Sequence, residues 1–362
     1  MSHISPNLRD KLPPDTYFTN PSIKPHSPKL IRQLSLIRPP HTPPTENSTF
    51  FLFFCKMYSK VDFTDRRLFS MNISEYKAFD VSGKLEMLLD HFGNSSRLAH
   101  KMDVSRNTIV RWNEDPSGMR PTHRLDLDVL FCDELVTPTL AKLPAPKPVL
   151  LPDDYRPADA IWRHRISDIA YGTYAIENPG ADRKTYEAVI EDSSIPKGIT
   201  KEEYFGSYNS WWVTQSIFNN LGVYPIKVDT VKRIHAELMK GVSEDAGQWA
   251  KGYRVMGKIQ DIDTTAPEDI QAEVAYWCGK YPEPETLLDI AKAHSHFIRV
   301  HPFADGNGRV GRALLFIHCL NAGLMPPVLD DTNQAIYYSV MYHAMKHGQN
   351  KPLAQVLADA SA

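Results

Sequence analysis

The sequence is poor in cysteine, has almost no net charge and contains no long apolar run. Only four of its 362 residues are cysteines, none in a Cys-x-x-Cys pair, which excludes a disulfide scaffold and a cysteine-based zinc module. A net charge of −2 excludes a global basic field for nucleic acid or anionic membranes. The longest strongly apolar run, 50–55, is far shorter than the roughly 20 residues that span a bilayer. We therefore expect a soluble, cytoplasmic protein.

Proline is abundant instead, and two proline-rich stretches divide the chain. The first predicts a disordered extension over 1–75, because proline at that density prevents helix formation. A natural start at Met57 or Met71 would place most of this stretch outside the natural protein. The second predicts a stiff linker over 138–157. Between them we expect a small helical domain over 80–137, and after them a larger domain over 158–362.

Residues 80–137 have the pattern of a helix-turn-helix. A first helix ends at Gly93-Asn94, Ser95 or Ser96 can cap a second, and Ser105 can cap a third after a tight turn. The third helix would present side chains suited to base edges and phosphates, namely Arg106, Asn107, Thr108 and Arg111. Acidic residues follow, so a helical bundle that binds nothing remains the alternative to DNA binding.

Beyond residue 157 the apolar spacing is mostly helical, which predicts an all-α fold. Only residues 252–265 break the pattern, and they suggest a short β-hairpin. The expected helices cover 158–176, 200–220, 229–239, 267–280, 285–300, 309–321 and 333–347.

The chemistry of the chain is concentrated in residues 301–312, His-Pro-Phe-Ala-Asp-Gly-Asn-Gly-Arg-Val-Gly-Arg. Pro302 stops the preceding helix, and the next one is expected to start near Arg309. Glycines on both sides of Asn307 allow consecutive N–H groups to converge at a helix N-terminus, where anions bind. Arg309 and Arg312 share one helix face and can bind further phosphate oxygens. The segment therefore predicts a polyphosphate-binding loop.

Two further residues of this loop suggest a reaction. Asp305 is an anion in an anion site, which is favourable only if a cation such as Mg²⁺ lies between its carboxylate and the phosphates. His301, at the start of the loop, is a candidate general base for a hydroxyl that attacks phosphorus.

Residues 301–312 resemble the signature of the Fic (Fic/Doc) family, HPFx(D/E)GNGRxxR, at every fixed position. The resemblance covers about the last 200 residues. It implies a helical Fic fold and transfer of AMP from ATP to a Tyr, Thr or Ser hydroxyl of a target protein or of the chain itself. It also implies that Asn307 and the loop N–H groups stabilise the α-phosphoryl charge, that Arg312 reaches the γ-phosphate and that Phe303 anchors the loop.

The resemblance extends beyond this signature. Residues 252–265 resemble the target-docking flap of the family, and Tyr337-Tyr338 resemble an aromatic pair that lines its adenine pocket. The residues expected at the nucleotide are thus Gly306, Asn307, Gly308, Arg309, Gly311, Arg312, Ile259, Gln260, Asp261, Ile262, Tyr337 and Tyr338.

Thr173-Tyr-Ala-Ile-Glu177-Asn178 has the form (S/T)xxxE(G/N) of the family's autoinhibitory motif, on a helix near 165–178. The resemblance implies that Glu177 pairs with Arg312, which the γ-phosphate of ATP needs. One alternative is an ordinary surface ion pair. Another is that Glu177 orients a water molecule for removal of AMP.

Two other functions stay open at this point. One is a DNA-binding regulator in which the Fic core is a sensor, and the other is a Fic enzyme that uses another nucleotide or a phosphocholine donor. The expected cofactor is Mg²⁺, and the expected partners are ATP, a target protein and, in the first alternative, DNA. A homodimer is also compatible with the sequence.

Overall fold

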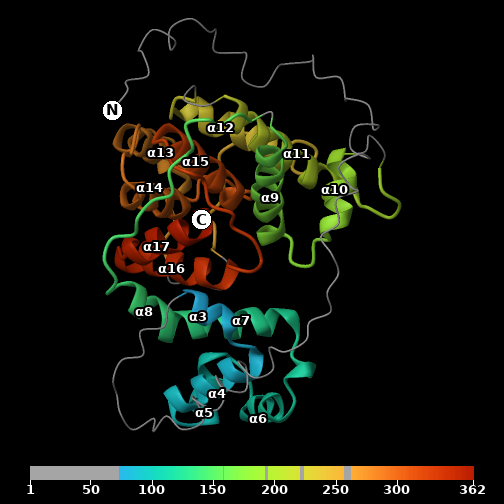
Figure 1. Ribbon diagram of the computed structural model, residues 1–362, viewed down its shortest axis with the longest axis vertical. Coiled ribbons are helices and arrows are strands. Elements are labelled where there is room, and N and C mark those ends of the chain that lie inside the picture. The colour runs from blue at the N-terminus through green and yellow to red at the C-terminus, as the bar shows by residue number, and fades with distance from the viewer. Residues whose placement is uncertain (1–72, 158, 192–194, 221–223, 257–261) are drawn as a thin grey trace, which may run out of the picture. The chain divides into compact units, whose positions relative to one another are not determined.

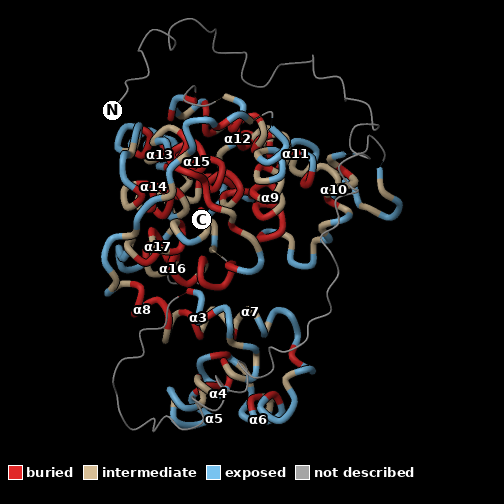
Figure 2. Tube along the Cα trace, viewed as in Figure 1, coloured by how far each residue is buried: buried red, intermediate tan, exposed pale blue. Residues whose placement is uncertain are grey.

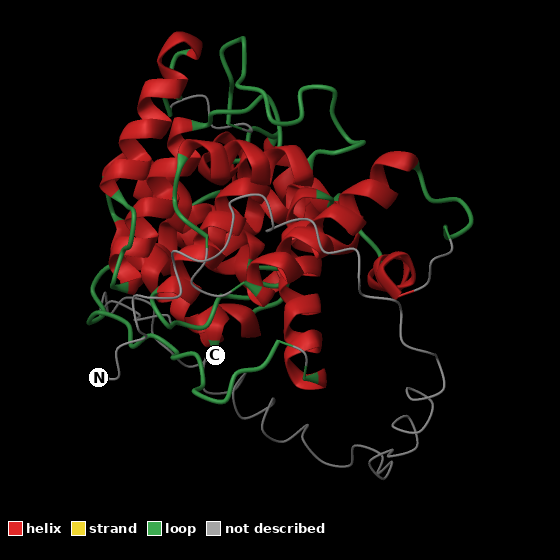
Figure 3. Ribbon diagram, turned by 90° about the horizontal axis from the view of Figure 1, so that it is seen from above, coloured by secondary structure: helices red, strands yellow, loops and turns green. Residues whose placement is uncertain are grey.

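The computed structural model describes residues 73–157, 159–191, 195–220, 224–256 and 262–362. Over these ranges the chain forms helices joined by loops, without a β-strand, as Figure 3 shows. This confirms the predicted all-α class. The hairpin expected over 252–265 includes residues outside the described ranges and stays a prediction. No helix of the described part is long and apolar enough to cross a membrane.

Short helices open the described part of the chain, and several of them begin at a side-chain cap. Gly93, with φ 76°, ends the first long one as predicted, and the Ser105 side chain caps the third helix of the expected motif. The second begins differently from the prediction, because the Asn94 side chain accepts from Arg97 N at 3.0 Å and Ser95 is already helical. These elements are α3 (Ile73–Ala78), α4 (Val81–Phe92), α5 (Ser95–Lys101), α6 (Arg106–Glu114), the 3₁₀ turn η2 (Pro116–Gly118) and α7 (Pro121–Phe131).

The next segment packs against the C-terminal helices. A π-helical turn η3 (Cys132–Val136) and α8 (Thr137–Leu140) follow α7, and all three contact α16 (Gln334–His347). The buried hydroxyls of Thr137 and Ser339 are hydrogen-bonded at 2.7 Å. Farther on, Leu150 forms an antiparallel bridge with Leu324. The expected linker is thus in contact with the core, and the division of the chain into the four parts given above stays a prediction.

The core is built around one central helix, α15 (Asn307–Asn321), which contacts α9, α11, α12 and α14 (Figure 1). Every residue from 309 to 320 is buried (red in Figure 2), as expected for a helix surrounded by others. The first turn of α15 is therefore held rigidly. The surrounding elements are α9 (Ala160–Glu177), α10 (Arg183–Glu191), α11 (Lys201–Asn219), α12 (Val228–Leu238), η4 (Pro267–Asp269), α13 (Ile270–Lys280), α14 (Leu287–Val300) and α17 (Asn350–Ser361).

The expected helices of the C-terminal part are present within a few residues, with two differences. α15 begins at Asn307 instead of near Arg309, because Gly306 takes the left-handed conformation that starts the helix directly after it. Two helices, α10 and α17, were not predicted.

Candidate active site

The candidate active site is the loop between α14 and α15. The preceding helix ends at His301, whose backbone is left-handed with φ 52° and ψ 57°. The following helix starts after Gly306, whose φ is 78°. A left-handed backbone is rare for a residue with a Cβ atom, and such residues cluster at functional sites. Both residues turn the chain sharply, and they join two buried helices through a short, fixed loop.

The imidazole of His301 is oriented by a backbone carbonyl. Its Nδ1 lies 3.1 Å from Ile298 O. Since a carbonyl oxygen only accepts, Nδ1 carries the proton of the neutral ring and the lone pair is on Nε2. Burial is the main cause that lowers the pKa of His301 below its ordinary value. The residue is therefore in the form that a general base requires near pH 7.

Asn307 binds the loop's own backbone. Its Oδ1 accepts from Phe303 N at 2.9 Å, and its Nδ2 donates to Phe303 O at 2.8 Å. Phe303 is fully buried, which confirms the expected anchor. The Asn307 amide thus holds the shape of the loop. Its backbone N–H, in the first turn of α15, and the second hydrogen of Nδ2 are left as donors for an anion.

Asp305 is the exposed acid of the loop, and Arg309 is its partner. Arg309 Nη2 lies 3.0 Å from Asp305 Oδ2, and Gly306 N donates to Asp305 Oδ1 at 2.6 Å. The Asp305 side chain is 68 % exposed, whereas that of Arg309 is 9 % exposed. Among the described residues no group of three or more His, Cys, Asp or Glu could hold a metal ion. A single carboxylate fits Mg²⁺ when phosphate oxygens complete its shell.

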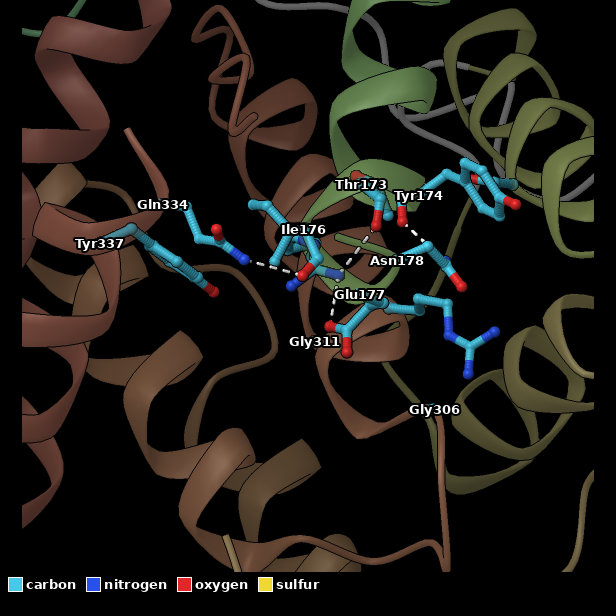
Figure 4. Close-up of polar contacts among 12 residues, drawn as sticks. Thr173, Tyr174, Ile176, Glu177, Asn178, Gly306, Gly311, Gln334 and Tyr337 are labelled. Atoms are coloured by element: carbon cyan, nitrogen blue, oxygen red, sulfur yellow. Dashed lines mark hydrogen bonds and ion pairs between the residues drawn. The ribbon is translucent and has the colours of Figure 1, made fainter. Parts of the chain in front are cut away.

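Glu177, at the end of α9, pairs with Arg312 of α15 (Figure 4). Arg312 Nη2 donates to Glu177 Oε1 at 2.7 Å and to Thr173 O at 3.1 Å. The Arg312 side chain is 1 % exposed and that of Glu177 is 31 % exposed. Burial tends to lower the pKa of Arg312, but the charge of Glu177 offsets this and the pKa is raised. The ion pair implied by the family resemblance is therefore present.

The carboxylate of Glu177 also lies against the backbone of the first turn of α15. A Cβ atom on Gly308 would overlap Glu177 Oε1, and it would lie 3.1 Å from Arg312 Nη1. Anions are attracted to this position by the N-terminal N–H groups and by the helix dipole. Glu177 thus occupies the place that the sequence predicted for phosphate.

The last turn of α9 is held by side chains that bind its free carbonyl groups. Gln334 Nε2 donates to Ile176 O at 2.9 Å (Figure 4). Tyr338 donates to the same oxygen at 3.3 Å. Asn178 Nδ2 donates to Tyr174 O at 2.8 Å. Since the final carbonyls of a helix have no partner within it, these contacts fix the turn that carries the acid.

The two tyrosines of the expected adenine pocket have different surroundings. Tyr337 is 3 % exposed, and it donates to His294 Nε2 at 2.7 Å while His294 Nδ1 donates to Gly311 O at 3.1 Å. Burial raises the pKa of Tyr337 to about 12 and lowers that of His294 to about 3. Tyr337 thus belongs to the core beside α15. Tyr338 is half-buried, and a contact with a base stays a prediction.

The expected flap is described only at its two ends. Ile259, Gln260 and Asp261 lie outside the described residues, and Ile262 is 7 % exposed. Arg254 holds the end of α14, where its Nε donates to His301 O at 2.8 Å. The first residues of the expected flap segment are therefore tied to the histidine of the loop through Arg254.

A cavity of about 210 Å³ opens beside the ion pair. It is lined by Glu177, Asn178, Asp305 and Arg309 together with residues of α11. Ligand pockets usually measure roughly 300–1,000 Å³, so this one is small while Glu177 is in place. A larger cavity of about 310 Å³, between 263–265 and α14, contains none of the predicted site residues.

The residues expected to contact DNA lie on α6. Arg106, Asn107 and Arg111 are exposed, whereas Thr108 is half-buried with its hydroxyl 2.8 Å from that of Ser105. Thr108 is thus engaged in the helix cap, and DNA binding through the other residues stays a prediction.

Three polar side chains near the loop were not among the site residues predicted from the sequence. They are Arg254, Gln334 and His235 of α12, whose Nε2 lies 3.1 Å from Asp305 O. Each contacts backbone atoms that are far away in the sequence or in a different element, so no residue spacing indicates it. Only Arg254 had a signal in the sequence, because it belongs to the Gly-Tyr-Arg run at 252–254 that resembles the start of the flap.

Comparison with known proteins shows what this site is similar to. Residues 225–319 match the Fic/DOC family model, and they include the loop up to and beyond Arg312. This range is therefore similar to Fic domains. Within it lie α12, α13, α14 and nearly all of α15, whereas α9 with Glu177 lies outside the matched range.

Two relatives of this chain carry names of one kind. The protein adenylyltransferase fic-1 of Caenorhabditis briggsae is 27 % identical over 200 residues, which are 53 % of this chain and 39 % of that protein. The protein adenylyltransferase fic-1 of Caenorhabditis elegans is 37 % identical over 143 residues, 38 % of this chain and 27 % of that protein. The matched part thus spans less than half the length of these relatives.

A solved structure of Fic-1 from C. elegans has the same fold. It aligns with a TM-score of 0.51 at 17 % identity, covering 88 % of this chain and 97 % of the solved chain. The likeness supports the helical Fic fold described above.

Proposed function

We propose that the chain is an autoinhibited protein adenylyltransferase, which transfers AMP from ATP to a Tyr, Thr or Ser hydroxyl of a target protein or of itself. The observation that carries the proposal is the Glu177 carboxylate between Gly308 and Arg312, at the start of α15. The position of this carboxylate indicates an anion site close to the loop that begins with His301, whose neutral ring is oriented by Ile298 O. The names of the relatives support the same activity.

In the proposed reaction His301 Nε2 takes the proton of the target hydroxyl, because Nδ1 is already bound to Ile298 O. The hydroxyl oxygen then forms a bond to the α-phosphorus of ATP. The bond between this phosphorus and the oxygen that bridges to the β-phosphate breaks, and pyrophosphate leaves. The products are the AMP ester of the target, pyrophosphate and the proton held on His301 Nε2, which together balance the atoms and charges of the step.

Two buried guanidinium groups support the assignment of the triphosphate to this place. Arg309 Nε and Arg312 Nε are buried and have no hydrogen-bond partner among the described residues. Buried donors without a partner are costly, and phosphate oxygens would satisfy them. Asp305 would hold Mg²⁺. When bound, the ion neutralises charge on the phosphates and on the leaving pyrophosphate.

The same contacts support autoinhibition. Glu177 uses Arg312 Nη2, the position that a terminal phosphate would need, and its oxygen lies against the Gly308 backbone. Two anions cannot share that place. ATP therefore binds productively only when Glu177 moves away.

The test compares the parent protein, Glu177→Gly and Glu177→Gly/His301→Ala with ATP labelled at either the α- or the γ-phosphate. We expect α-label on protein in the single variant, none in the double variant, and no γ-label on protein in any of them. Binding of ATP should survive in the double variant. Protein carrying γ-label would indicate a kinase, and failure to bind ATP with Mg²⁺ would point to another donor such as a phosphocholine conjugate. Either result would overturn the proposal.

A further inference from the structure

His235 contacts the loop through both nitrogens of its ring. The residue is 2 % exposed, and its Nδ1 accepts from Gly247 N at 2.8 Å. Its Nε2 lies 3.1 Å from Asp305 O. Since a backbone amide only donates and a carbonyl only accepts, the ring is neutral with its proton on Nε2. One tautomer therefore satisfies both contacts.

The face of the same ring is stacked on the loop's anchor. The ring centres of His235 and Phe303 are 3.7 Å apart, and the planes differ by 8°. Gly306 lies close by, because a Cβ atom there would be 2.8 Å from Met239 Sδ and 3.5 Å from His235 Cδ2. The loop thus rests on α12 and the turn after it, with little space between them.

The contact with Asp305 O has a consequence for the position of the Asp305 carboxylate. The carbonyl of Asp305 and the N–H of Gly306 belong to one trans peptide group, in which the two bonds point in opposite directions. Holding the oxygen toward His235 therefore turns the N–H away from α12. In the structure this N–H donates to Asp305 Oδ1 at 2.6 Å.

We propose that His235 is a positioning residue, which orients the peptide between Asp305 and Gly306 and, through the N–H of Gly306, the Asp305 carboxylate. The proposal deepens the proposed function and rests on it for the role of the carboxylate toward Mg²⁺. It concerns the loop itself, however, and it can be tested without any reaction.

The test uses two amides, each of which replaces one nitrogen of the imidazole. His235→Gln places its amide N–H near Nε2 and keeps a donor for Asp305 O, whereas His235→Asn places its amide near Nδ1 and keeps only the acceptor for Gly247 N. His318→Asn is the matched control, because His318 is also buried and bonded to a carbonyl, Tyr281 O at 3.1 Å, but does not touch the loop. All variants are made in the full chain, with and without Glu177→Gly.

The first measurement is the amide resonance of Gly306 and its rate of hydrogen exchange in the protein without nucleotide. We expect His235→Asn to shift the resonance and to raise the exchange rate about tenfold or more, and His235→Gln to stay close to the parent. His318→Asn should lower the melting temperature without moving this resonance. Equal behaviour of the two His235 variants, or a shift in His318→Asn as large as in His235→Asn, would overturn the proposal.

The second measurement is the affinity for ATP with Mg²⁺ and with a chelator. His235→Asn should lose roughly tenfold in the Mg²⁺-dependent part of the affinity, and His235→Gln should retain most of it. An equal loss with and without Mg²⁺ would refute the link to Asp305. If Glu177→Gly transfers no AMP, the proposed function fails, while the resonance of Gly306 still decides the role of His235.

Discussion

Replacing Glu177 by glycine should raise the rate of the proposed AMP transfer by roughly ten- to fortyfold. The carboxylate binds Arg312 through one nitrogen only, at 2.7 Å. A single hydrogen bond between charged groups contributes about 1.5–3 kcal/mol, and each 1.4 kcal/mol corresponds to about a factor of ten. The Glu177 side chain is 31 % exposed, so solvent screening favours the lower half of this range.

The assay is the initial rate of transfer of α-labelled AMP, measured as kcat/KM for ATP. Glu177→Gln is the matched control, because it keeps the volume of the side chain and a neutral hydrogen bond to Arg312 but removes the charge. We expect it to be activated less than Glu177→Gly. In the absence of ATP, Glu177→Gly should also melt at a lower temperature than the parent, since the Arg312 charge is buried and loses its partner. ATP should then raise the melting temperature of this variant more than that of the parent.

One result would refute this reasoning. If neither Glu177→Gly nor Glu177→Gln transfers AMP faster than the parent, although both bind ATP as the parent does, then the carboxylate does not compete with the nucleotide. The contact with Arg312 would then be structural, like an ordinary ion pair at a surface.

Three further predictions follow from the same site. Transfer should depend on neutral His301, and because burial lowers its pKa, the acid limb of kcat/KM in Glu177→Gly should lie below about pH 6.5; a rate that rises on acidification would contradict a general base. Asp305→Asn should abolish most of the gain in ATP affinity that Mg²⁺ gives, measured by calorimetry with and without a chelator, and an undiminished gain would place the ion elsewhere. Gln334→Leu removes the donor to Ile176 O, a bond worth about 1 kcal/mol, so it should activate the parent about fivefold and add nothing to Glu177→Gly; a further increase in the double variant would mean that it acts by another route.

The loop could be predicted because its chemistry lies within twelve consecutive residues. Proline and glycine there mark the end of one helix and the start of the next, and both positions agree with the structure within two residues. The pairing of Glu177 with Arg312 was predicted only through the family resemblance, because 135 residues separate them. Residue spacing alone carries no information on such a contact.

The two helices that were missed lack the pattern on which prediction depends. α10 buries only Tyr186 and Val189, so its apolar face is short. α17 carries Pro352 near its start, which suggests a break, although proline is tolerated in the first turn of a helix because the N–H it lacks would have no partner there. For His235 and Gln334, the partner is a backbone oxygen in a different element. Any residue supplies such an oxygen, so the sequence pattern cannot reveal the contact.

The burial of Arg312 limits how the proposed autoinhibition can be released. The side chain is 1 % exposed, and a buried charge without a partner costs several kcal/mol. Arg312 is therefore not left without an anion after Glu177 leaves and before a phosphate binds. One anion must replace the other directly at Arg312 Nη2. A signal that only weakens the last turn of α9 is then sufficient, because ATP itself supplies the charge that stabilises Arg312 once Glu177 leaves. The contacts to Ile176 O from Gln334 and Tyr338, and that of Asn178 with Tyr174 O, are described side-chain bonds that oppose this movement, so such a signal would act on them.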